Sequence, residues 1–117
     1  MPVVVACLCA QWCSNCRAYR ATFDAIAREQ AGVRFVWIDI EDESELVGSI
    51  DVENLPTLLI GAGQGPLFFG PITQQPEILR RLVQSHLADE KRAPLPDIDV
   101  HALLARMRDR VTPPCET

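Results

Sequence analysis

Hydrophobic and polar residues follow two different periods along the chain. The uninterrupted apolar run Val3–Cys9, rich in valine, predicts a strand that is buried on both faces. Between residues 13 and 30 the apolar side chains recur on one helical stripe, which predicts an amphipathic helix that ends before Gly32. The same two patterns predict strands at residues 34–40, 57–60 and 66–70 and helices at residues 42–50, 76–87 and about 100–111.

The order of these elements is β-α-β-α-β-β-α followed by one more helix, which predicts an α/β protein. The alternating first part predicts parallel strands with right-handed crossovers, and the glycine-rich turn at residues 61–65 predicts a hairpin that adds an antiparallel edge. Residues 88–96 are charged and contain two prolines, which predicts a linker. We therefore expect one domain over residues 1–88. Residues 89–117 are expected to form a linker and a helical extension that packs on the domain or on a partner subunit.

The composition narrows the classes of function. The chain has 117 residues, 48% of them hydrophobic, which suits one domain with a single core. No apolar run approaches the ~20 residues of a membrane span, and no charged segment precedes a cleavable apolar one, so neither a membrane protein nor a signal peptide is expected. The formal net charge is −5 and no basic cluster occurs, which argues against nucleic acid as a partner. We expect a cytoplasmic protein whose five cysteines serve redox or metal chemistry rather than a disulfide scaffold.

The stretch Trp12-Cys13-Ser14-Asn15-Cys16 lies where the first predicted strand gives way to the first predicted helix. Unpaired backbone N–H groups and the helix dipole favour negative charge at a helix start, and this stabilises the thiolate of Cys13. Cys16 lies one turn further on, within reach of Cys13, and can resolve a mixed disulfide. We interpret Cys13 as the attacking cysteine and Cys16 as the resolving one.

The Trp-Cys-x-x-Cys turn, the element order and Leu55-Pro56-Thr57 before a strand together resemble the thioredoxin family. The resemblance covers roughly residues 2–87 and implies a thioredoxin-like three-layer fold with a central mixed four-stranded sheet flanked by helices. It also implies that Pro56 follows a cis peptide bond, faces the cysteine pair and, with Leu55, positions an extended substrate segment. By the same resemblance, Trp12 shields one side of the nucleophile. Gly70 falls near the substrate groove.

The chain departs from the family pattern in ways that affect the chemistry. Where the family often has a buried carboxylate beneath the cysteine pair, this sequence has Cys7, which cannot shuttle protons as an aspartate does. Ser14 and Asn15 replace the usual Gly-Pro between the cysteines. Because neither is charged, we expect a potential nearer the reducing end of the family's range.

The family's opening strand and helix also lack a counterpart before Trp12. We therefore expect the strand at residues 34–40 to be an edge of the sheet. The C-terminal helix, capped by Asp97 or Asp99, would cover the vacated surface, in cis or across a homodimer. A competing interpretation is that this helix docks a client.

The remaining polar residues and thiols have simpler interpretations. Strand alternation puts Cys7 and Cys9 on one face, where both are expected to pack as small apolar groups, although a Cys9–Cys13 bridge is an alternative. Cys115 lies in a tail and is expected to be an idle thiol. Asp39 is expected to be a loop-facing carboxylate, with proton acceptance as its alternative role. His86 and His101 are expected to be ordinary helix residues.

Together these features predict a thiol-disulfide oxidoreductase that reduces protein disulfides and takes part in cell redox homeostasis. It would use no dissociable cofactor and no metal, and a reductase or a small thiol would recycle it. Two alternatives stay open. One is a redox-switched binding or adaptor module without efficient turnover, and the other is a metal-binding protein.

Overall fold

The structure is a computed structural model that describes residues 3–30, 32–48, 55–73, 75–88 and 93–111, with the side chains of residues 88 and 108–111 excepted. Four strands form one mixed sheet in the order β2-β1-β3-β4, in which β2 is parallel to β1 and the other neighbours are antiparallel. The strand bounds are β1 Val3–Cys9, β2 Val33–Asp39, β3 Thr57–Ala62 and β4 Gly65–Pro71.

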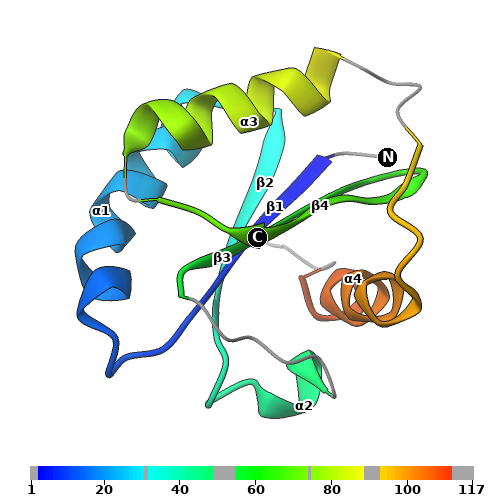
Figure 1. The fold of residues 1–117 in the computed structure, drawn as a ribbon, viewed down its shortest axis with the longest axis horizontal. Coiled ribbons are helices and arrows are strands. Elements are labelled where there is room, and N and C mark those ends of the chain that lie inside the picture. Colours follow the sequence, from blue (N-terminus) through cyan, green and yellow to red (C-terminus); the bar gives the residue numbers. More distant parts are fainter. Residues whose placement is uncertain (1–2, 31, 49–54, 74, 89–92, 112–117) are drawn as a thin grey trace.

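Helices cover both faces of the sheet (Figure 1). The long helices α1 and α3 contact each other and bury their apolar stripes against one face, whereas α4 and the short α2 pack on the other. The helix bounds are α1 Ser14–Glu29, α2 Ser44–Val47, α3 Pro76–Ala88 and α4 Ile98–Val111. These three layers confirm the expected α/β fold, and β2 is an edge strand as expected. None of the described helices is both long and apolar enough to cross a membrane.

The direction of β3 differs from the sequence prediction. Alternation of strands and helices predicted a parallel strand, but β3 runs antiparallel to β1. A parallel connection needs a crossover of a dozen or more residues that returns along the whole sheet. The helix predicted at residues 42–50 is a single turn, α2, which lies at the end of the sheet where β2 finishes (Figure 1). Residues 42, 43 and 48 of that prediction form turns, and residues 49 and 50 lie outside the described residues.

The last helix, α4, is built into the core on the face opposite α1. Asp97 caps it, since its Oδ1 accepts hydrogen bonds from the backbone N–H groups of Asp99 (2.9 Å) and Val100 (3.3 Å). The Arg106 guanidinium donates to the carbonyl oxygens of Leu46 (2.7 Å) and Val47 (3.2 Å) and so ties α4 to the end of α2. Four side chains of α4 are buried against β1 and β3, namely Val100, Leu103, Leu104 and Met107. The division into residues 1–88 and 89–117 stays a prediction.

At Gly61 the sheet lies tightly against Leu104 of α4. A Cβ atom built at Gly61 would lie 2.6 and 2.7 Å from the two methyl carbons of Leu104 and 3.2 Å from its Cγ, so the whole side chain would have to move. We expect Gly61→Ala to lower the free energy of unfolding by about 1–3 kcal/mol, the usual cost of overpacking. Urea denaturation measures this, and in the background Leu104→Ala the further loss from Gly61→Ala should be smaller. Equal losses in both backgrounds would contradict the proposed clash.

Candidate active site

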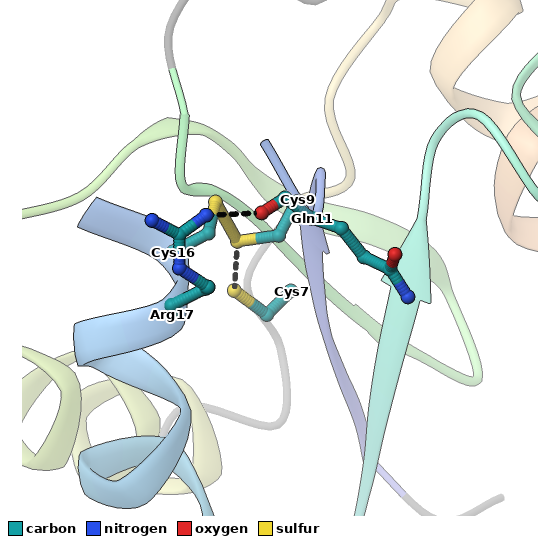
Figure 2. Close-up of a disulfide and its surroundings, with 5 residues drawn as sticks. All are labelled: Cys7, Cys9, Gln11, Cys16 and Arg17. Carbon is teal, nitrogen blue, oxygen red and sulfur yellow. Dashed lines mark hydrogen bonds between the residues drawn. A yellow bond between two sulfur atoms is a disulfide. The ribbon is translucent and has the colours of Figure 1, made fainter. Parts of the chain in front are cut away.

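Three of the cysteines meet where β1 ends and α1 begins. Cys9, the last residue of β1, and Cys16, in the first turn of α1, form a disulfide with their Cα atoms 5.7 Å apart. Both residues are only 1% exposed. Cys7 lies on the same face of β1, and its Sγ is 3.6 Å from the Sγ of Cys9 (Figure 2). The strand and the helix therefore hold a row of sulfur atoms inside the core.

The pairing of Cys9 corrects the sequence interpretation. We expected Cys9 to pack as a small apolar group, with a bridge to Cys13 as the alternative, but it is bonded to Cys16. Alternation along β1 does put Cys7 and Cys9 on one face, as expected, and that face is the one that α1 covers. The side chain of Cys16 also enters this core. The end of β1 therefore presents Cys9 directly to Cys16.

Cys13 is half-buried and carries a free thiol. It occupies the N-cap position of α1 in an extended conformation, and its carbonyl oxygen accepts a hydrogen bond from the N–H of Arg17 at 3.2 Å. The next two residues, Ser14 and Asn15, are exposed. The side chain of Cys13 makes no capping hydrogen bond to the start of α1, so the helix does not engage the thiol. This position suits a nucleophile that is accessible to a partner.

Burial dominates the chemistry of Cys7. Desolvation raises the pKa of this thiol to about 12, and the charge of Arg20 opposes the rise only in part. The hydroxyl of Tyr19 is also buried and has no hydrogen-bond partner among the described residues. Burial, and secondly the nearby Cys7, raises the pKa of Tyr19 above its usual range. Cys7 is therefore a neutral thiol at physiological pH and a poor nucleophile.

The raised pKa of Cys7 predicts a loss of stability in alkali. Folded protein keeps the Cys7 proton up to about pH 12, whereas the unfolded chain loses it near the ordinary value of 9.0. The contribution to stability is therefore complete below pH 9.0 and is lost as the pH rises towards about 12. Between about pH 8 and about pH 10.5, the free energy of unfolding of the wild type should fall by about 2 kcal/mol more than that of Cys7→Ala. Urea denaturation in excess reductant measures this difference, and equal losses would contradict it.

The structure also places the residues that the family resemblance singled out. The Leu55–Pro56 peptide bond is cis and Pro56 is buried. In the antiparallel ladder of β1 and β3 the last pair is Leu8 with Thr57, so one residue further the chain reaches Cys9 on one side and Pro56 on the other. Leu55 packs against the same buried cluster that holds the disulfide. Pro56 thus lies at the end of the sheet where the cysteines gather.

Trp12 and Gly70 flank this end of the molecule in different ways. Trp12 is 64% exposed, and its Nε1 donates a hydrogen bond to Glu41 at 3.1 Å, which links the turn before α1 to the chain after β2. Gly70 pairs with Leu58 on β4 and is half-buried. The exposed indole thus directly precedes the half-buried Cys13 in the chain.

A cavity of about 520 Å³ opens beside Cys16. Asp39 lines it, but its Oδ1 accepts hydrogen bonds from the N–H groups of Glu41 (2.9 Å) and Asp42 (3.1 Å), which confirms it as a loop-facing carboxylate. Arg20 also lines the cavity and lies over the ring of Trp37, 4.7 Å from its centroid. The surface next to the disulfide therefore carries charged side chains of both signs.

Sequence reasoning missed the connection between Arg17 and the end of β1. The guanidinium of Arg17 donates a hydrogen bond to the carbonyl oxygen of Gln11, which fastens the first turn of α1 to the loop that carries Trp12 (Figure 2). No pattern in the sequence indicates this contact. For Cys9 a signal was present, because a cysteine at the end of the strand that leads into the motif shares a face with the covering helix.

The remaining candidate residues are two histidines and Cys115. His86 Nδ1 lies 2.7 Å from the Leu82 carbonyl oxygen, and His101 Nε2 lies 2.6 Å from that of Leu95, so both rings serve local packing as expected. Among the described residues no three His, Cys, Asp or Glu side chains gather in a way that could hold a metal ion. Cys115 lies outside the described residues.

Comparisons with known proteins agree with this geometry. A model of the family described as Thioredoxin matches residues 1–78. The crystal structure of thioredoxin from Trypanosoma brucei brucei is similar to this chain at 30% identity with a TM-score of 0.66, and covers 75% of this chain and 77% of that one.

Two more solved structures show the same fold. Fasciola hepatica thioredoxin is 24% identical with a TM-score of 0.66, over 73% of this chain and 81% of that one. The germline-specific thioredoxin Deadhead from Drosophila melanogaster is 20% identical with a TM-score of 0.64, over 72% of this chain and 80% of that one.

Proposed function

Because this chain belongs to the thioredoxin family, we propose that it reduces disulfides in protein substrates, with Cys13 as the attacking cysteine and Cys16 as the resolving one. The family, the fold and the neighbouring cysteines support a thiol-disulfide oxidoreductase kind of function. The direction of electron flow and the kind of substrate are the further steps of the proposal.

The reaction consists of two thiol-disulfide exchanges. The Cys13 thiolate attacks one sulfur of the substrate disulfide, the other substrate sulfur leaves as a thiolate, and a mixed disulfide forms. The Cys16 thiolate then attacks the sulfur of Cys13, and the second substrate sulfur leaves. The substrate gains two electrons and the protein is left oxidised. No step needs a dissociable cofactor or a metal ion.

The observation that carries the proposal is the free, half-buried thiol of Cys13 at the start of α1, one turn from Cys16. Attack requires a thiol that a protein substrate can reach, and burial would forbid it. The exposed Trp12 and the cis Leu55–Pro56 bond stand at the same end of the molecule and would position an extended substrate segment. Gly70 on the last strand would leave room along that segment.

The partners follow from the chemistry. A dithiol that reduces proteins must itself be reduced, so we propose a reductase or a small thiol as electron donor. We also propose a cytoplasmic location, where the donor thiols are kept reduced, and a role in cell redox homeostasis. A homodimer stays part of the proposal and is tested by light scattering.

The test combines turnover with a redox titration. The protein should accelerate the reduction of a protein disulfide by dithiothreitol. Equilibration with glutathione buffers should place the potential of its dithiol at or below the cytosolic glutathione poise of about −220 to −320 mV. A potential far above that range would identify an oxidant instead. Absence of acceleration would refute oxidoreductase turnover.

One observation favours a second candidate, a redox-switched binding module. Because Cys16 is bonded to Cys9 in the structure, Cys13 stands without a resolving partner. In that state a mixed disulfide at Cys13 would persist and hold a client. Stoichiometric capture of a disulfide-containing protein without turnover would support this candidate over the first.

A further inference from the structure

Cys16 has two possible disulfide partners, Cys9 at the end of β1 and Cys13 within the motif. We propose that Cys9 is a third redox-active cysteine. Cys9 attacks Cys16 in a Cys13–Cys16 disulfide by thiol-disulfide exchange. The oxidised protein then holds a buried Cys9–Cys16 disulfide, and Cys13 is a free thiol. This inference rests on the proposed function of Cys13 and Cys16 and adds a residue to it.

The structure bonds Cys16 to Cys9 and leaves Cys13 three residues before Cys16 along the chain. Cys9 and Cys16 have Cα atoms 5.7 Å apart and are bonded. Cys13 is the N-cap residue of α1 and precedes Cys16 by three residues, the separation at which the two thiols of a Cys-X-X-Cys motif can pair. Cys16 thus has Cys13 as its partner within the motif and Cys9 as its partner on β1.

The exchange needs no added oxidant or reductant. The Cys9 thiolate attacks the Cys16 sulfur of a Cys13–Cys16 disulfide, the bond between Cys13 and Cys16 breaks, and Cys13 leaves as a thiolate. One disulfide is lost and one is formed, so the protein stays oxidised by two electrons. The proton that Cys9 releases passes to Cys13 or to water.

Burial favours the product of this exchange. Cys9 is 1% exposed, and its neighbour Cys7, 3.6 Å away, has a pKa raised to about 12 by desolvation. A disulfide carries neither a charge nor a proton that needs solvation, so it suits the buried end of β1, and the exchange leaves the free thiol on the half-buried Cys13. Placing the disulfide inside and the free thiol at the half-buried position lowers the free energy of the oxidised protein.

The exchange changes what the oxidised protein can do. With Cys16 held by Cys9, Cys13 is available to attack again, and no second cysteine of the motif is free to resolve the product. A mixed disulfide formed in this state lasts until a small thiol, the proposed electron donor, reduces the Cys9–Cys16 disulfide. The freed Cys16 thiolate then attacks the sulfur of Cys13, and the substrate sulfur leaves as a thiolate. The buried disulfide thus separates capture of a partner from its release.

The test maps thiols and disulfides in the oxidised full-length protein. Protein oxidised by diamide is quenched with acid, alkylated with N-ethylmaleimide, digested without reductant and analysed by mass spectrometry. Wild type should give a Cys9–Cys16 cross-linked peptide and alkylated Cys13. Cys13→Ser should still lose two thiols on oxidation. In Cys9→Ala the disulfide should join Cys13 and Cys16, and alkylation of Cys13 should fall to near zero.

The matched control is Cys7→Ala, which removes a buried thiol from the same face of β1 and should leave the wild-type pattern unchanged. A wild-type protein that yields only Cys13–Cys16, or a Cys13→Ser variant that keeps its thiols, would overturn the role of Cys9. Turnover is measured separately. Loss of the Cys9–Cys16 peptide with turnover intact rejects only this inference, whereas turnover that survives in Cys13→Ser rejects the proposed function.

Discussion

Replacing Cys13 with serine should abolish the reduction of protein disulfides, with a loss of rate on the order of 10³-fold or more. A serine hydroxyl stays protonated at neutral pH and cannot form the mixed disulfide, so the first exchange has no nucleophile. Turnover of a protein disulfide in the presence of dithiothreitol measures the effect. Circular dichroism should show an unchanged fold, because Cys13 is only half-buried and makes no disulfide.

Two further variants sharpen this prediction. Cys16→Ser should also lose turnover, but it should accumulate a covalent complex between Cys13 and the substrate, visible on a non-reducing gel. Cys7→Ala should retain turnover, since Cys7 is a buried neutral thiol. Equal activity in wild type and Cys13→Ser would remove the basis of the proposed mechanism.

A chain that ends at Pro94 should fail to fold stably. Truncation removes four side chains that are at most 3% exposed, which leaves one face of the sheet uncovered. Fully burying one such side chain stabilises a protein by about 1.5–3 kcal/mol, so the loss is on the order of 6–12 kcal/mol. A domain of this size has a total stability of about 5–15 kcal/mol. The truncated chain should therefore lose its cooperative thermal transition.

Point variants test the same helix without truncation. Leu103 is fully buried, and Leu103→Ala should lower the free energy of unfolding by about 2–5 kcal/mol. Ile98 lies on the same helix but is 81% exposed, and Ile98→Ala should change it by no more than about 0.5 kcal/mol. Urea denaturation distinguishes the two. A truncated chain that melts at the wild-type temperature would show that α4 is dispensable.

Local patterns predicted most of the elements but not the direction of one strand. The apolar run of β1 and the stripe of α1 are found with almost the expected bounds, because each is a periodicity that the core then satisfies. The direction of β3 depends on whether the connection before it crosses back along the whole sheet. The acidic residues after Asp39 predicted a helix over residues 42–50, but only Ser44–Val47 forms one.

Parts of the site made by residues close together in the sequence were predictable. Parts that depend on contacts between distant segments were not. The spacing of Cys13 and Cys16 is visible in the sequence, and so is Pro56 before a strand. The partner of Cys9 depends on which face of β1 receives α1, and this is decided by packing. The hydrogen bond from Arg17 to the Gln11 carbonyl joins a side chain to a backbone oxygen, and no pattern of residue types predicts such a contact.

The two faces of the sheet have different roles, one beside the motif cysteines and the other in supporting the fold. The motif cysteines lie at the start of α1 on one face, and α4 supports the other face through apolar contacts and the hydrogen bonds from Arg106 to the end of α2. A label, affinity handle or fused protein attached to the solvent side of α4 should therefore leave electron exchange undisturbed. Random variants should likewise divide into those that lower the yield of soluble protein and those that stay well folded but lose disulfide exchange.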